Sequence, residues 1–188
     1  MAGKLGKKTY HLKQTVVLIG MMGAGKTAVG RALAELIGVG FVDSDHEIEL
    51  ASHRTIAEIF ERDGEAFFRA RESEIITRLL SCSPSIVSTG GGAFLQARNR
   101  DAIFSGGVSV WLQADLELLW ERVRHKNTRP LLQTDDPKET LAVLYDERVP
   151  IYAKAQLRVA AEPGLSINMM AHKVAGALID AGALTEKE

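Results

Sequence analysis

The sequence contains a single cysteine and no long apolar run, and each of these shortages excludes a class of structure. One cysteine, Cys82, allows neither an internal disulfide nor a zinc site built from cysteine pairs. No apolar segment approaches the ~20 residues that a membrane-spanning helix needs. The N-terminal segment is basic but has no apolar stretch of the kind a secretory signal carries. We therefore expect a cytoplasmic protein without membrane contact.

The sequence also lacks an excess of either charge. Its 23 Lys and Arg residues and 24 Asp and Glu residues give a formal net charge of -1. General basicity drives nonspecific nucleic-acid binding, so we expect no nucleic-acid partner. The five histidines show no metal-ligand spacing such as H-E-x-x-H, which favours structural roles for them. No spare apolar stripe indicates a subunit interface, and we expect a monomer.

What the sequence does contain is an alternation of short apolar segments with amphipathic helical ones. Its 188 residues suffice for one α/β domain and are few for two. Uniformly apolar segments predict five strands of a parallel sheet covered on both faces, at residues 15–19, 40–43, 85–89, 108–112 and 157–161. Strands alternating with helices predict a doubly wound, three-layer α/β fold. We place a loose basic tail at residues 1–13, with a helix there as the alternative, and a single domain at residues 14–188.

Several expected helices are marked by residues that cap their first turn. The capping residues are Thr55 (with Glu58 as its capping-box partner), Asp115, Asp136 (followed by a proline) and Ser166. Further helices are expected over residues 27–37 and 65–80. Pro150 is expected to break or kink the helix in which it lies. Because ligands of doubly wound sheets bind beyond the carboxyl ends of the strands, the segments that follow the strands are the candidates for a site.

The segment from Gly20 to Thr27 reads GMMGAGKT and matches G-x-x-x-x-G-K-[ST] at every fixed position. It lies between an expected strand and an expected helix, where backbone N–H groups and the positive helix end bind anions. Lys26 supplies a cation for the β- and γ-phosphates, and Thr27 supplies a hydroxyl ligand for Mg²⁺. The segment predicts a nucleoside triphosphate site. A glycine-rich turn with a solvated lysine is the structural alternative.

Two aspartates follow the second expected strand. Asp43 and Asp45 are two residues apart, so in an extended segment their side chains point the same way. One carboxylate could hold a water of the Mg²⁺ shell, and the other could accept a proton from an attacking hydroxyl. The alternative is that Ser44 or Asp45 only caps a helix that begins at His46.

A helical segment and a glycine triplet add possible contacts for an acceptor. Arg69 and Glu72 are three residues apart, so the carboxylate can hold the guanidinium in a fixed pose. An ordinary surface pair is the alternative. The glycines at 90–92 would let a substrate lie against backbone N–H groups, and a flexible turn is the alternative.

Two more arginines stand beside prolines. Arg129 precedes Pro130 in a basic stretch, which suits a mobile lid whose arginine reaches the transferred phosphoryl group. Arg148 stands two residues before Pro150, where a solvated helix end is the alternative. A guanidinium fork matches a carboxylate. The arginines at 69 and 148, the aspartates and the glycines together predict a small hydroxylated carboxylic acid as phosphoryl acceptor.

Taken in order, six segments resemble the shikimate kinase family: GMMGAGKTAVGRALA, FVDSDHEIE, IAEIFERDGEAFFRARE, STGGGAF, TRPLL and ERVPIYAKA. The resemblance runs from about Gln14 to Ala160. It implies a P-loop kinase fold and transfer of the γ-phosphate of ATP to a hydroxyl of shikimate, in the pathway to chorismate and the aromatic amino acids. The sequence departs from the family in a short lid stretch at 124–129 and in the segment AAEPG at 160–164, which lacks the polar run expected beside the adenine.

The resemblance also implies a role for individual residues. ATP would be bound by Gly23, Ala24, Gly25, Lys26, Thr27, Ala28 and Arg129. Mg²⁺ would be held by Thr27 and Asp43. Shikimate would be bound by Asp45, Arg69, Gly91, Gly92 and Arg148. The catalytic residues would be Asp45 as the base, Lys26 and Arg129.

Two other functions compete with this one. A gluconate-type sugar-acid kinase shares the fold and the class of acceptor, but we do not expect it to carry the ordered D-S-D, F-R-x-x-E and G-G-G set. A nucleotide-binding switch would hydrolyse ATP slowly and would have no use for a carboxylate pocket made by Arg69 and Arg148.

Overall fold

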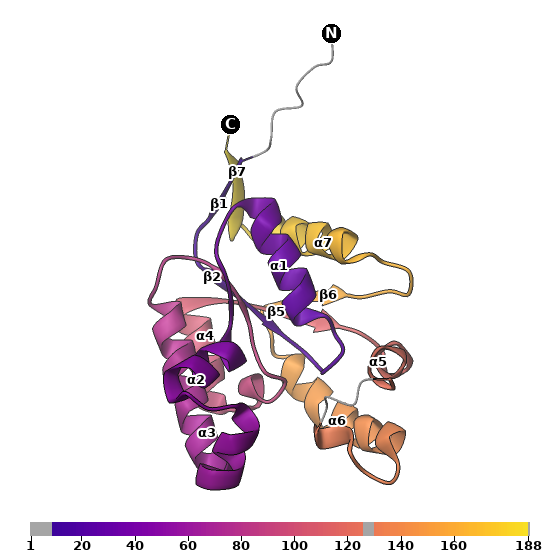
Figure 1. Cartoon of the computed structure of the whole chain (residues 1–188). Coiled ribbons are helices and arrows are strands. Elements are labelled where there is room, and N and C mark those ends of the chain that lie inside the picture. The colour runs from indigo at the N-terminus through magenta and orange to yellow at the C-terminus, as the bar shows by residue number, and fades with distance from the viewer. Residues whose placement is uncertain (1–8, 126–129, 188) are drawn as a thin grey trace.

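A five-stranded parallel sheet lies at the centre of the molecule (Figure 1), in the order β3-β4-β2-β5-β6. The structure is a computed structural model and describes residues 9–125 and 130–187. The strands of the sheet are β2 (Thr15–Ile19), β3 (Phe41–Asp43), β4 (Ile86–Ser88), β5 (Gly107–Gln113) and β6 (Leu157–Ala160). All neighbouring strands pair in parallel, and the predicted doubly wound α/β fold is confirmed.

The central strands are buried along their whole length. Every residue of β2 and β4 is buried, because these strands have neighbours on both sides and helices around them. A strand in this position shows a continuous apolar run rather than alternation. The predicted bounds of the five strands differ from the observed ones by at most one residue at either end.

Three groups of helices gather around the sheet in Figure 1: α1 with α7, α2 with α3 and α4, and α5 with α6. The helices are α1 (Lys26–Ile37), α2 (Ser44–Ser52), α3 (Ile56–Leu80), α4 (Ala97–Gly106), α5 (Leu116–Val123), α6 (Pro137–Tyr152) and α7 (Ile167–Asp180). Two short 3₁₀ turns are η1 (Ala93–Leu95) and η2 (Pro130–Leu132). Within residues 9–125 and 130–187, no helix has the length and apolar character needed to cross a membrane.

The predicted capping residues are confirmed. Thr55 and Glu58 exchange the two bonds of a capping box, and a backbone N–H three residues on donates to each of Asp115, Asp136 and Ser166. Of the break or kink predicted at Pro150, the break is not observed, because α6 continues through this residue to Tyr152. Pro150 lies in the last turn of α6, so it removes a single backbone donor close to the helix end.

Helix α3 consists of two pieces that meet at Gly64. This glycine has φ 81° and ψ 174°, a conformation that essentially only glycine adopts. The second piece begins at Glu65, as the predicted helix over residues 65–80 requires. The change of direction at Gly64 therefore sets how Glu65 and Arg69 approach the sheet.

Residues 9–12 contradict the prediction of a loose tail that extends to residue 13. They form β1 (Thr9–Leu12), which pairs antiparallel with β7 (Leu184–Lys187) in a separate two-stranded sheet. Both strands have only four residues and their partners lie far apart in the sequence, so no local pattern marks them. Leu12 and Leu184 face each other in this ladder, and both are buried in the hydrophobic core.

Candidate active site

A cleft of about 480 Å³ opens beyond the carboxyl ends of β2, β3 and β4. Its lining comes from the loop between β2 and α1, the start of α2, the segment after β4, Arg122 of α5 and the segment that leads into α7. Ligands of doubly wound sheets bind at this edge. The structure therefore brings the predicted phosphate loop and both predicted aspartates into one cleft.

The loop from Gly20 to Lys26 has the shape of a phosphate-binding loop. Gly23 and Gly25 have φ values of 82° and 91°, which favour glycine over other residues. The Nζ atom of Lys26 donates to the carbonyl oxygens of Gly20 at 2.9 Å and Met21 at 3.0 Å. The predicted nucleotide-binding residues Gly23, Ala24, Gly25, Lys26, Thr27 and Ala28 all line the cleft.

Asp43 links this loop to α2. Its Oδ2 accepts a hydrogen bond from the Thr27 hydroxyl at 3.1 Å, and its Oδ1 accepts one from the backbone N–H of Asp45 at 3.1 Å. The second bond makes Asp43 the N-cap of α2. The alternative that Ser44 or Asp45 caps a helix beginning at His46 is therefore wrong, because the helix begins at Ser44.

Oxygen donors gather at the predicted metal position. The Thr27 and Ser88 hydroxyls lie 3.3 Å apart, and Thr27 contacts the Asp43 carboxylate. Among the described residues no group of three or more His, Cys, Asp or Glu side chains could hold a metal ion. One carboxylate with hydroxyl groups nevertheless fits Mg²⁺, which binds proteins through few carboxylates and completes its shell with waters and phosphate oxygens.

Asp45 lines the cleft in an environment that disfavours its charge. Burial raises the pKa of Asp45 to about 6, the nearby Asp43 adds to the rise, and Lys26 opposes it. Its Oδ1 atom is buried and has no hydrogen-bond partner in the described part of the chain. A carboxylate that is both unpartnered and more basic than usual is suited to accept a proton.

The glycine triplet touches three of the predicted acceptor-binding side chains, one at each glycine. A Cβ atom placed on Gly90 would lie 2.8 Å from Oδ1 of Asp45. One on Gly91 would lie 3.3 Å from Nη1 of Arg148, and one on Gly92 would lie 2.6 Å from Nη2 of Arg69. Side chains larger than hydrogen would displace these groups. The structure thus brings together residues from α2, α3 and α6 on one backbone segment.

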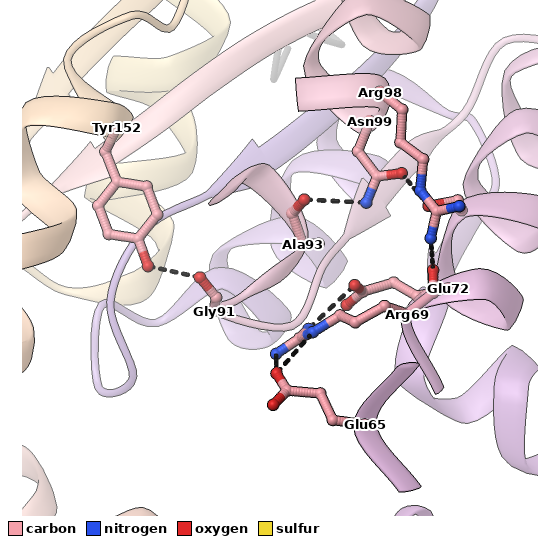
Figure 2. Close-up of polar contacts among 9 residues, drawn as sticks. Glu65, Arg69, Glu72, Gly91, Ala93, Arg98, Asn99 and Tyr152 are labelled. Atoms are coloured by element: carbon pink, nitrogen blue, oxygen red, sulfur yellow. Dashed lines mark hydrogen bonds and ion pairs between the residues drawn. The ribbon is translucent and has the colours of Figure 1, made fainter. Parts of the chain in front are cut away.

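Arg69 lies between two carboxylates of α3, as Figure 2 shows. Its Nη1 donates to Oε2 of Glu72 at 3.0 Å, while its Nε and Nη2 donate to Oε1 of Glu65 at 3.3 and 3.2 Å. Glu72 is completely buried, and burial raises its pKa while Arg69 opposes the shift. An ordinary surface pair does not describe the bond to Glu72, because a buried carboxylate needs its cationic partner.

Two side chains of the site were not predicted from the sequence. Tyr152 is completely buried, and its hydroxyl donates to the carbonyl of Gly91 at 2.6 Å (Figure 2). Arg122 lines the cleft and donates to the carbonyl of Gly23 at 3.2 Å. In both cases the acceptor is a backbone carbonyl far away in the sequence. No local sequence pattern could therefore indicate these two hydrogen bonds. Tyr152 fixes the peptide that follows Gly91, between Arg148 and Arg69.

One predicted residue cannot be placed. Arg129 and residues 126–128 of the predicted lid stretch lie outside the described residues.

A phosphate-binding loop and an aspartate with a raised pKa lie together at the carboxyl edge of a parallel sheet. This arrangement defines a P-loop phosphotransferase. A family model for shikimate kinase matches residues 22–178. The chain belongs to the shikimate kinase family, whose members are ATP-dependent kinases. The family resemblance of the sequence is thereby confirmed.

Individual relatives agree with this assignment. A shikimate kinase from Ruegeria pomeroyi is 61% identical over 167 residues, which cover 89% of this chain and 86% of the relative. The structure of a shikimate kinase from Acinetobacter baumannii in complex with shikimate is 40% identical, with a TM-score of 0.84 over 89% of this chain and 94% of that one. A gluconokinase from Sinorhizobium meliloti is 20% identical, with a TM-score of 0.57 over 91% and 94% of the two chains, and shares the fold alone.

Proposed function

We propose that this chain transfers the γ-phosphate of ATP to a hydroxyl of shikimate, with Asp45, Arg69, Arg148 and the glycine triplet as the acceptor site. The convergence of those three side chains on three consecutive glycines carries the proposal. It puts a base at one end of a backbone platform and two guanidinium groups toward the other. A hydroxylated carboxylic acid presents the matching groups, because a carboxylate binds guanidinium and a hydroxyl needs a base.

In this proposal Asp45 accepts the proton of the attacking hydroxyl. With its pKa near 6, the carboxylate is mostly ionised at neutral pH and is a stronger base than an ordinary aspartate. The hydroxyl oxygen forms its bond to the γ-phosphorus as the bond to the β-phosphate oxygen breaks, so that ADP leaves. The loop N–H groups and Lys26 stabilise the charge on the phosphate oxygens during this transfer.

We propose Thr27 and Asp43 as the residues that hold Mg²⁺. The contact between the Thr27 hydroxyl and Asp43 Oδ2 supports the pairing. When bound, Mg²⁺ neutralises negative charge on the phosphate oxygens and orients them.

We propose several further properties from the sequence. Arg129 is proposed to contact ATP from a mobile lid, by family resemblance. The balanced charge argues against a nucleic-acid partner. We also propose a monomer, because the sequence has no spare apolar stripe, that acts in the cytoplasm on a free small molecule without a membrane partner. The product, shikimate 3-phosphate, would enter the pathway to chorismate.

The test is ADP release from ATP in a coupled assay with shikimate, shikimate carboxamide, gluconate or no acceptor. We expect turnover with shikimate, a strongly raised KM for the carboxamide and no turnover with the other two. Arg148→Lys keeps the charge but loses the planar fork, so it should raise the KM for shikimate by roughly 10- to 100-fold and leave the KM for ATP unchanged. Lys26→Ala should abolish turnover. Equal rates with gluconate, or without acceptor, would contradict the proposal.

A further inference from the structure

The guanidinium of Arg69 has one edge on which an external carboxylate could bind. The buried carboxylate of Glu72 accepts a hydrogen bond from Nη1 at 3.0 Å. The backbone of Gly92 lies against the end that carries Nη1 and Nη2, since a Cβ there would come within 2.7 Å of both atoms. The remaining edge is formed by Nε and Nη2. A carboxylate binds such an edge through two parallel hydrogen bonds.

Glu65 occupies that edge. Its Oε1 accepts hydrogen bonds from Nε at 3.3 Å and from Nη2 at 3.2 Å (Figure 2). The Glu65 side chain is 67% exposed, whereas the side chain of Glu72 is only 1% exposed. The two carboxylates therefore differ in mobility, because Glu72 is enclosed in the core while Glu65 can turn into solvent.

The position of Glu65 in α3 makes that movement easy. It is the first residue after Gly64, where α3 leaves helical geometry. Within the described residues, Arg69 is its only hydrogen-bond or ion-pair partner. Breaking this contact would release Nε and Nη2 of Arg69 for another carboxylate, while Nη1 keeps its bond to Glu72.

We propose that Glu65 is an internal competitor for the acceptor's carboxylate: it holds the Nε and Nη2 edge of Arg69 in the free protein and is displaced when the acceptor binds. The inference rests on the proposed function, in which Arg69 binds that carboxylate. Glu65 neutralises the exposed side of Arg69 and lowers its affinity for any anion. An acceptor must then bind Arg69 better than Glu65 does, which disfavours ligands without a well-placed carboxylate.

The size of the effect follows from the exposure of the pair. An exposed ion pair of this type corresponds to roughly a two- to fivefold population ratio. A protein whose competent state is only partly populated binds its ligand more weakly by that fraction. A two- to fivefold excess of the closed state leaves a third to a sixth of the protein competent, so removing the competing charge should lower the KM and the dissociation constant of shikimate by about three- to sixfold.

The experiment compares Glu65→Gln and Glu65→Ala with Glu74→Gln as the matched control. Glu74 pairs with Arg71 at 2.6 Å on the same helix, three residues apart, and is 61% exposed. We expect both Glu65 variants to bind shikimate more tightly, by calorimetry and by KM, with the KM for ATP unchanged. Glu74→Gln should behave like the native protein. With shikimate carboxamide, the Glu65 variants should gain nothing.

An unchanged or raised KM for shikimate in both Glu65 variants would overturn the inference, and a raised one would indicate that Glu65 positions Arg69 or contacts the acceptor. If the native protein phosphorylates shikimate and the Glu65 variants do not gain affinity, the inference alone fails. If the native protein neither binds nor phosphorylates shikimate, the proposed function fails.

Discussion

Asp45 combines two demands that oppose each other. The role as a base that we propose for Asp45 requires a charged carboxylate, while burial and the neighbouring Asp43 raise its pKa to about 6. The folded protein therefore binds this proton more tightly than the unfolded chain does, since the ordinary value is 3.8. The stabilisation from the protonated form is complete below pH ~4 and is lost as the pH rises through about 6.

The first prediction is that Asp45→Asn stabilises the fold while it destroys activity. At pH 8 the native protein holds an ionised, buried carboxylate that the variant lacks. The gap in unfolding free energy between variant and native protein should widen by about 1–2 kcal/mol from pH 5 to pH 8, or roughly 2–6 °C in Tm. Turnover should fall by at least ~10²-fold.

Thermal unfolding at both pH values measures this gap. Asp101→Asn, at an exposed aspartate of α4, is the control. A gap for Asp45→Asn that closes between pH 5 and pH 8 would contradict the prediction.

Single residues of the site were predictable to the extent that the sequence carries a local pattern. The phosphate loop, the aspartate pair and the glycine triplet each stand within a few residues after a strand, so strand order placed them at one edge. Tyr152 and Arg122 were missed because each acts on a distant carbonyl. For Asp43 the prediction was incomplete. The sequence pattern predicted that Asp43 lies near the metal, but it did not predict that Asp43 also caps α2.

At the scale of elements, the break in α3 sets the direction of the helical piece that carries Glu65 and Arg69. Gly64 has φ 81° and ψ 174°, and a Cβ there would meet nothing within 4 Å. Space therefore does not demand a glycine at this position, and the backbone conformation does. Gly176 in α7 is the opposite case, because it is helical and its Cβ would also meet nothing.

These two glycines give the second prediction. Gly64→Ala should destabilise the protein by about 1–3 kcal/mol, since alanine rarely adopts this conformation. Gly176→Ala should stabilise it by about 0.5–1 kcal/mol, since alanine loses less entropy in a helix. Urea unfolding of both variants measures the difference. If both variants shift stability in the same direction, the backbone explanation for Gly64 is wrong.

Elements differ in how far the sequence predicted them. The five sheet strands were found because burial on both faces leaves a continuous apolar signature. Strands β1 and β7 carry no such signature, since each has four residues and pairs with one strand only. Pro150 led to the prediction of a helix break that is not present. A proline in the last helical turn removes one hydrogen bond and does not end the helix.

At the scale of the whole molecule, the β1–β7 ladder ties residues near both ends of the sequence to one core. The third prediction concerns its buried pair. Leu12→Ala and Leu184→Ala should each cost about 2–5 kcal/mol in unfolding free energy. The double variant should lose less than the sum, because the two leucines face each other.

Urea unfolding gives the three stabilities, with Leu50→Ala at a 55% exposed leucine as the control. Activity below the melting temperature should be retained, since among the described residues that line the cleft none belongs to β1 or β7. Strictly additive losses would mean that the two leucines do not share a contact.

The ladder also has a consequence for how the chain is made. Thr9 and its partner Lys187 are 178 positions apart, so a ribosome finishes one strand long before it begins the other. At usual synthesis rates β1 waits on the order of 10 to 35 s with its backbone groups unpaired. Short strands with polar residues are poor templates for another chain. Because β1 is short, it leaves no pattern in the sequence. For the same reason, we expect it to be a poor aggregation template while β7 is still being translated.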